Sequence, residues 1–324
     1  MEAWKNIRIF AVLKKSSIRQ VINRINNIQF IVMYKIEKHP ILDIPQSEMV
    51  EFIYDGQKVQ GRKGYTIAAA LHQAGYPVHS HSIDGRNRSL NCGIGKCGAC
   101  EMVVDGQVRR ICVTLVDGVK EVHHVDTEAS EIPDIREQQP REVKVYKTQV
   151  AIIGAGPAGL ACREQLNAFG ISNLVIDNNS RIGGQFNMQT HQFFFFEKEK
   201  KFGGMRGFDI AKTLAGDDAS GILLNNTVWD LLEGRRVAIK NIETGDISYI
   251  DADYLVVATG AVPFMPTFEN DDVPGVYTAA VFQKMMNQEH TLLGKRVLTV
   301  GAGNIGYLTS YQAMQSGAQV VAIV

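Results

Sequence analysis

Apolar and polar residues alternate over two short segments near position 50, as they do in strands with one buried face. Residues 50–54 alternate, the Asp55-Gly56 pair predicts a tight turn, and residues 58–62 predict a returning strand. Thr66 stands where it can cap a helix over residues 67–74. A hairpin followed by a helix indicates a small β-grasp-like α+β module, which we place at residues 48–126.

A second pattern begins near residue 150, where short segments are apolar throughout. The run 150–153 predicts a buried parallel strand, and a glycine-rich turn, a helix over residues 160–169 and a strand over residues 173–176 follow it. The same order recurs at residues 296–324. Two such βαβ units predict an α/β fold of the Rossmann type after the α+β module.

Composition shifts mark the expected boundaries. Residues 127–146 are polar and acidic and include two prolines, which is typical of a linker. We expect an N-terminal extension at residues 1–47, the α+β module at 48–126 and the linker at 127–146. A first nucleotide-binding domain follows at 147–292, and part of a second one at 293–324.

The first 32 residues differ from the rest of the chain. They hold six Lys and Arg side chains against one Glu, and their apolar runs are too short for a secretory signal. A basic amphipathic targeting helix is one interpretation. The interpretation we favour is an extension that is not native before Met33.

Overall composition excludes some classes of partner. The chain has 324 residues, 34 basic and 34 acidic side chains, and 45% hydrophobic residues, as a soluble protein has. A balanced charge gives no argument for nucleic acid or an anionic membrane, and no apolar run reaches membrane-spanning length. We therefore expect no nucleic-acid partner and no membrane span.

Four of the five cysteines have the spacing Cys92-x4-Cys97-x2-Cys100-x11-Cys112. Three thiolates in one glycine-rich loop and a fourth beyond a hairpin form a ligand set for a [2Fe–2S] cluster. Zinc sites usually pair two C-x2-C knuckles, and disulfides suit small secreted domains. The spacing favours the cluster over both alternatives, and cluster-binding thiols indicate a reducing compartment, for which we expect the cytoplasm.

The first glycine turn predicts a dinucleotide site. Gly154 makes the turn, Gly156 admits a pyrophosphate, Gly159 lets the helix pack closely, and Asp177 can accept hydrogen bonds from a ribose. The pyrophosphate would lie at the helix N-terminus. We include Pro157 and Ala158 of that terminus in the expected site.

The second glycine turn has the same form, with Gly301, Gly303, Asn304 and Gly306 as the expected cofactor-binding residues. The residue that separates NAD from NADP would follow the next strand, beyond Val324. The preference between these cofactors therefore stays unpredicted.

Residues 48–126 resemble the [2Fe–2S] ferredoxin-like domains of xanthine dehydrogenase-type and sarcosine oxidase-type enzymes. Residues 148–324 resemble flavoproteins with two dinucleotide-binding domains. That second resemblance implies FAD at the first turn and NAD(P) at the second. It also implies that a second segment approaches the FAD, with the residues Arg181, Gly183, Gly184 and Gln185. A third segment closes the FAD domain, with the residues Ala258, Thr259 and Gly260.

The combination resembles the α-type subunits of sarcosine oxidase, opine oxidase, hydrogen cyanide synthase and hydroxyproline dehydrogenase. This implies an oxidoreductase that works with a β-type flavoprotein subunit on an amine or amino acid. Catalytic residues stay unknown. Cys162 is the only cysteine after residue 112, so the sequence offers no pair for disulfide reductase chemistry.

Two other functions compete with this one. The chain would be a diaphorase that oxidises NAD(P)H, or an inactive fragment in which only the iron–sulfur domain works. The resemblance also implies that the rest of the second nucleotide domain and the end of the first are missing, so we expect a C-terminally shortened version of a longer protein.

Overall fold

The structure is a computed structural model, and it describes residues 34–125, 143–193, 202–218 and 220–324. The described residues group into two compact units. Of the described residues, unit 1 contains 34–125 and 263–324, and unit 2 contains 143–193, 202–218 and 220–262. The expectations for residues 1–32 and for most of the linker lie outside the described residues.

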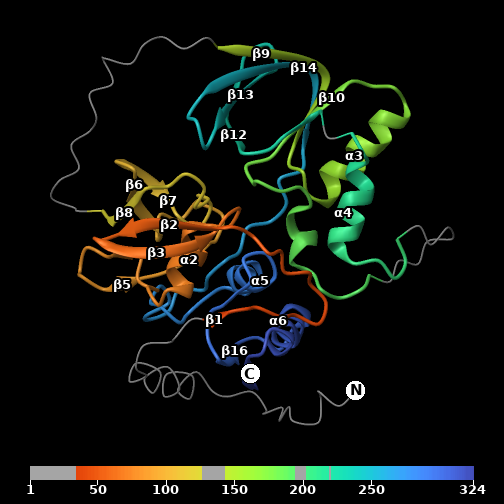
Figure 1. The fold of residues 1–324 in the computed structure, drawn as a ribbon. Helices are drawn as coiled ribbons and strands as arrows, with labels where there is room; N and C mark the ends of the chain where they lie inside the picture. Colours follow the sequence, from red (N-terminus) through yellow and green to blue (C-terminus); the bar gives the residue numbers. More distant parts are fainter. Residues whose placement is uncertain (1–33, 126–142, 194–201, 219) are drawn as a thin grey trace. The chain divides into compact units, whose positions relative to one another are not determined.

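Unit 1 contains a five-stranded sheet in the order β3-β2-β8-β6-β7, seen at the orange and yellow end of the colour range in Figure 1. Strand β2 pairs antiparallel with β3 and parallel with β8, which closes the β-grasp arrangement. The bounds are β2 Met49–Tyr54, β3 Gln57–Arg62, α2 Ile67–Gln73, β4 Ser80–His81, β5 Asn87–Arg88, β6 Glu101–Val104, β7 Gln107–Arg110 and β8 Glu121–His124.

The expected hairpin and helix of this module are confirmed. Asp55 and Gly56 adopt positive φ angles of 44° and 78° between β2 and β3, as a tight hairpin turn requires. The Thr66 hydroxyl accepts a hydrogen bond from the Ala69 backbone amide and caps α2. Residues 67–72 of α2 are all buried, so the helix is held by packing on the core more than by its own short length.

Residues 263–324 complete unit 1. Their elements are α5 Ala279–Asn287, β15 Thr291–Leu292, β16 Arg296–Thr299, α6 Asn304–Gln315 and β17 Gln319–Ile323. Strands β16 and β17 are parallel neighbours, and β15 pairs with the short strand β1, Tyr34–Lys35. One hydrophobic core includes Ile36, residues of α2 and residues of α5, so these distant segments share their buried surface.

Unit 2 is a six-stranded mixed sheet in the order β11-β10-β9-β14-β13-β12. Strands β11, β10, β9 and β14 are parallel neighbours, and β12 and β13 extend the sheet as antiparallel strands. The bounds are β9 Lys144–Ile153, α3 Pro157–Ala168, β10 Asn173–Ile176, η3 Gly184–Met188, α4 Gly207–Ala215, β11 Ile222–Leu223, β12 Asn226–Leu232, β13 Arg236–Asn241 and β14 Ile247–Val257.

The expected strand–turn–helix–strand order is confirmed in both α/β segments. Helices α3 and α4 pack against each other beside the green strands of Figure 1. Leu160 of α3 and Ile152 of β9 are fully buried in one core, as the apolar run predicts. The fold class, an α+β module followed by Rossmann-type α/β structure, is thereby borne out.

Candidate cluster and nucleotide sites

The hairpin of β6 and β7 brings two of the four cysteines together. Cys100 directly precedes β6, Cys112 follows β7, and Glu101 pairs with Arg110 across the hairpin. The Ile111 amide donates to the Cys100 carbonyl at 3.1 Å, which extends the ladder to the cysteines themselves. Two cysteines that stand twelve positions apart in the sequence are thus brought within hydrogen-bonding reach of each other.

The other two cysteines lie on the loop before the hairpin. The backbone amides of Ile94 and Lys96 donate to the Cys92 sulfur at 3.5 Å and 3.3 Å. Hydrogen bonds from the Cys112 and Cys97 thiols hold the pKa of Cys92 below its usual value. The sulfurs of three cysteines therefore face one another, and backbone donors point at one of them.

The environment of the sulfurs is asymmetric. Cys100 and Cys112 are buried, whereas Cys97 is exposed. Hydrogen bonds with Cys100 and Cys92, and then burial, raise the pKa of the Cys112 thiol, and the Lys284 ammonium opposes this rise. A cluster held here would have one side in the core and the other toward solvent.

The donor set fits a [2Fe–2S] cluster. Four thiols converge, and amide donors reach sulfur, as cluster sites require. Across the described ranges, no group of three or more His, Cys, Asp or Glu side chains is arranged to hold a single metal ion. A [2Fe–2S] cluster needs two protein thiolates on each iron, so it places a different demand on the geometry.

Helix α5, which comes from the C-terminal part of the sequence, packs against this loop. The Thr278 hydroxyl donates to the Asn91 carbonyl at 3.3 Å. The Lys284 ammonium donates to the Gly93 carbonyl at 2.7 Å and to the Cys112 carbonyl at 3.0 Å. Sequence reasoning missed both residues, because contacts across 172 to 191 positions leave no local signal in the sequence.

The first glycine turn lies in unit 2, between β9 and α3. Gly154 has a φ of 113°, and a Cβ there would lie 2.3 Å from the Ala258 carbonyl oxygen. A Cβ on Gly159 would lie 1.8 Å from the Gly154 carbonyl oxygen, so the turn and the helix touch backbone to backbone. A Cβ on Gly156 would meet nothing within 4 Å, which leaves open space above the start of α3.

Several other expected FAD residues surround this turn. The Asp177 carboxylate accepts hydrogen bonds from the Ala155 amide at 2.6 Å and from the Asn179 amide at 2.8 Å. Its Oδ1 also accepts from the Asn179 side-chain amide at 2.7 Å, so the open lone pair for a ribose hydroxyl lies on Oδ2. A Cβ on Gly184 would lie 3.1 Å from the Gly156 Cα, so the second glycine segment adjoins the first.

The remaining expected residues of unit 2 fall into two groups. The Gly183 amide donates to the Ala155 carbonyl at 2.8 Å, and the Ala258 amide donates to the Ile153 carbonyl at 2.8 Å. Both contacts bring a distant segment to the turn. The others lie at the start of α3, before and inside η3, or after β14, and these are Pro157, Ala158, Arg181, Gln185, Thr259 and Gly260.

An open cradle and an acidic side chain at the end of β10 fit FAD. Both features sit at the carboxyl ends of parallel strands, where dinucleotides bind in this kind of fold. Pro157 occupies the first turn of α3, where its missing amide costs no hydrogen bond. The first amides of a helix have no partner within it, so the N-terminus of α3 suits a phosphate.

The second glycine turn lies in unit 1 and repeats the geometry of the first. Gly301 has a φ of 114°, and its amide donates to the Val324 carbonyl at 2.6 Å. A Cβ on Gly306 would lie 1.8 Å from the Gly301 carbonyl oxygen, whereas Gly303 has open space. Asn304 begins α6. The turn is exposed and fits a pyridine nucleotide by the same argument as the first turn.

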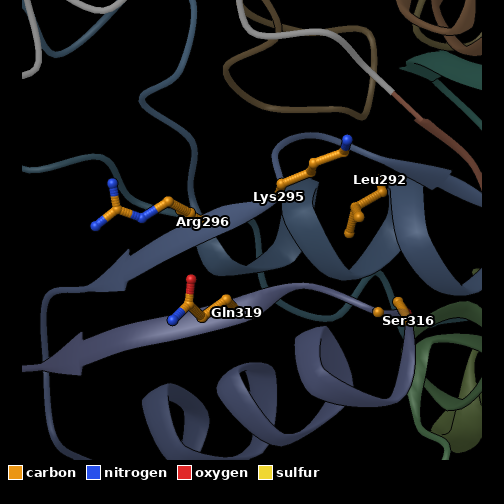
Figure 2. A pocket seen from close by; sticks show the side chains of 6 residues that line it. Leu292, Lys295, Arg296, Ser316 and Gln319 are labelled. Atoms are coloured by element: carbon orange, nitrogen blue, oxygen red, sulfur yellow. The ribbon is translucent and has the colours of Figure 1, made fainter.

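A separate hollow of about 510 Å³ opens beside β16 and β17 (Figure 2). Its lining comes from the amino-terminal ends of both strands and the chain leading into them: Leu292, Lys295, Arg296, Ser316, Gly317 and Gln319. Nucleotides bind at the carboxyl ends of such strands. We therefore do not assign this hollow to the nucleotide site.

Comparison with protein families gives two matches. A model described as pyridine nucleotide-disulphide oxidoreductase matches residues 148–324, which is more than half of the chain. A model described as a 2Fe-2S iron-sulfur cluster binding domain matches residues 47–126.

Two curated relatives are named as subunits of oxidases. The alpha subunit of sarcosine oxidase from Corynebacterium sp. (strain P-1) is 20% identical over 307 residues, covering 89% of this chain and 31% of the relative. An opine oxidase subunit from Agrobacterium tumefaciens (strain Ach5) is 26% identical over 186 residues, covering 51% of this chain and 34% of the relative. The chain thus spans about a third of the length of these relatives.

The fold also matches a solved structure. L-proline dehydrogenase from P. horikoshii aligns with a TM-score of 0.70 and 20% identity, covering 89% of this chain and 56% of that one. Over the described residues, no helix is long and apolar enough to cross a membrane. The expected pairing of an iron–sulfur domain with a flavin- and pyridine-nucleotide-type oxidoreductase is confirmed, and the residue assignments within each site stay predictions.

Proposed function

The chain belongs to the pyridine nucleotide-disulphide oxidoreductase family, and we propose that within it this chain is the electron-transferring component of an amine or amino-acid dehydrogenase complex. The observation that carries the proposal is the presence of a four-cysteine loop and an open FAD-type glycine turn in one chain. When bound, FAD exchanges two electrons with an organic substrate, and the cluster carries one electron at a time.

The residues of the chain have distinct parts in this function. Cys92, Cys97, Cys100 and Cys112 would hold the cluster, and the backbone amides near Cys92 would donate to its sulfurs. Gly156 and the start of α3 would receive the pyrophosphate of FAD, and Asp177 would bind its ribose.

Partner and substrate classes follow from the names of the relatives. Sarcosine oxidase and opine oxidase are described by subunit, which supports a multi-subunit complex for this chain as well. We propose that the partner is a β-type flavoprotein subunit, with a secondary amine or amino acid as the substrate. The cluster thiols support the cytoplasm as the location, because free thiolates persist in a reducing compartment.

The second candidate function is a diaphorase that oxidises NAD(P)H. The exposed second glycine turn, with open space at Gly303, favours it. A diaphorase would take its electrons from the pyridine nucleotide and would need no amine-oxidising partner.

The first test is a visible spectrum of anaerobically purified protein, with iron, sulfide and flavin counted per chain. About two irons, two sulfides and one FAD are expected. Dye reduction is then measured with sarcosine, proline or an opine in the presence of a candidate β-type subunit, and with NADH or NADPH alone. Reduction by an amine only in the complex supports the first function, and reduction by NAD(P)H alone supports the diaphorase. Iron without flavin would show that this chain works as an iron–sulfur domain only.

A further inference from the structure

Lys284 is a buried lysine that reaches the cluster loop from α5. The residue is 9% exposed, and its ammonium donates to the carbonyl oxygens of Gly93 and Cys112. These two carbonyls belong to the loop and to the strand end that carry the cluster ligands. One side chain therefore ties together both parts of the four-cysteine site.

The helix is fitted to the loop around this lysine. A Cβ on Gly93 would lie 3.1 Å from a methyl carbon of Val281 and 3.8 Å from the Lys284 Cδ. Thr278 both caps α5, by accepting from the Val281 amide, and donates to the Asn91 carbonyl. The contact between α5 and the loop is thus close packing with three specific hydrogen bonds.

No carboxylate in the described part of the chain forms an ion pair with Lys284. The nearby Glu289 carboxylate binds the amide and hydroxyl of Thr66 instead. A buried ammonium with only carbonyl partners is costly unless a negative charge lies close to it. The four thiolates and the cluster that they hold would supply that charge.

We propose that Lys284 is a positioning residue that holds the cluster loop and raises the reduction potential of the [2Fe–2S] cluster. A cluster with four thiolate ligands is negatively charged, and its negative charge grows by one on reduction. An ammonium fixed in a low-dielectric surrounding therefore stabilises the reduced form more than the oxidised form. This inference requires the cluster but not the proposed dehydrogenase function.

The test compares midpoint potentials measured by EPR-monitored redox titration. Lys284→Met removes the charge and keeps the length of the side chain, Lys284→Gln keeps one donor, and Lys284→Arg keeps the charge. Lys96→Met is the matched control, because Lys96 lies in the same loop but is exposed. Iron content and the visible circular dichroism of the cluster report whether each variant still holds it.

We expect Lys284→Met and Lys284→Gln to lower the equilibrium constant for reduction at least tenfold, which is about 59 mV for one electron. Lys284→Arg and Lys96→Met should shift it less. Loss of iron from both neutral variants, with iron kept in Lys284→Arg, would also support the proposal, because only Lys284→Arg keeps the positive charge. An unchanged potential in an iron-loaded Lys284→Met, or equal loss of iron from the Met, Gln and Arg variants, would overturn it. Wild-type protein that binds no iron would instead refute the cluster itself.

Discussion

The glycines of the first nucleotide turn have different structural roles, although each is simply a glycine in the sequence motif. A Cβ on Gly159 would meet the Gly154 carbonyl oxygen at 1.8 Å, whereas a Cβ on Gly156 would stand in open space. Gly159 therefore serves the fold of the turn. Gly156 serves the approach of a ligand, because its backbone conformation suits any residue.

This difference predicts opposite results for two alanine variants. Gly159→Ala should destabilise unit 2 by more than about 4 kcal/mol, because backbone atoms must separate. Gly156→Ala should change the free energy of unfolding by less than about 1 kcal/mol, yet the protein should lose most of its FAD. Urea unfolding and flavin counts measure both effects. Normal flavin content in Gly156→Ala would contradict the assignment of this cradle.

Two histidines of unit 1, His72 and His79, are buried as neutral rings. His72 and His79 are fully buried, with ring centroids 4.8 Å apart. Burial lowers the pKa of His72 to about 3, and burial, followed by the nearness of His72, places the pKa of His79 well below its usual value. The helix C-terminus near His72 would favour a charged ring, but the loss of water outweighs it.

The depressed pKa values predict a loss of stability in acid. Below about pH 6.5 the two histidines bind protons in the unfolded chain but not in the folded one, so the free energy of unfolding falls as pH falls. At pH 5 each should cost about 2 kcal/mol relative to pH 7.5. Urea unfolding at both pH values should show that His72→Phe loses about half as much free energy of unfolding between pH 7.5 and pH 5 as the wild-type protein. The full loss should remain in the control His81→Phe, where the side chain is exposed, and an equal loss in both variants would refute the argument.

At the scale of single elements, the sequence predicts the features that depend on residues close to one another in the chain. The cap at Thr66, the turn at Asp55-Gly56 and the order of strand, turn and helix around Gly154 each rest on a few adjacent residues, and each is confirmed. The sequence pattern does not single out helix α5. Its buried lysine is a polar residue in a pattern that usually places polar residues outside.

Contacts between elements that are distant in the sequence explain why the sequence pattern does not reveal the role of α5. The Thr66 amide and hydroxyl donate to the Glu289 carboxylate at 2.9 Å and 3.1 Å, across 223 positions. Gln73 donates to Thr291, and Tyr65 shares a hydrogen bond with His290, in the same region. No periodicity in the sequence reports such pairs, since each partner alone reads as an ordinary polar residue.

The two capping threonines should therefore differ in their effect on stability. Thr66→Val removes the cap of α2 and one hydrogen bond to a buried carboxylate, so we expect a loss of about 2–3 kcal/mol. Thr278→Val removes the cap of α5 and a hydrogen bond to a carbonyl, and about 1–2 kcal/mol should be lost. Thr66→Ser and Thr278→Ser keep the hydroxyls and serve as controls. Chemical denaturation ranks the variants, and equal losses would show that Glu289 contributes little at Thr66.

At the scale of the whole chain, the cysteine loop and the first glycine turn belong to different compact units. Residues 263–324 share a core with the iron–sulfur module, although the sequence assigns residues 263–292 to the first nucleotide domain. Compact units group residues by contact and not by the cofactor that they bind, so the domain boundaries stay predictions. The sequence could not indicate this grouping, because hydrophobic patterns show which faces are buried but not what buries them.

Separate units predict separate loss of the cofactors. Cys97→Ser removes one thiolate from an exposed part of the loop and should abolish bound iron and sulfide, while the flavin count of the protein stays unchanged. Cys162→Ser is the control, because Cys162 lies on α3, outside the four-cysteine loop, and should keep both cofactors. Iron, sulfide and flavin are counted on the same samples. Among the described residues, the hydrophobic clusters of unit 2 consist of residues of unit 2, so flavin lost together with iron in Cys97→Ser would show that the two units depend on each other for folding.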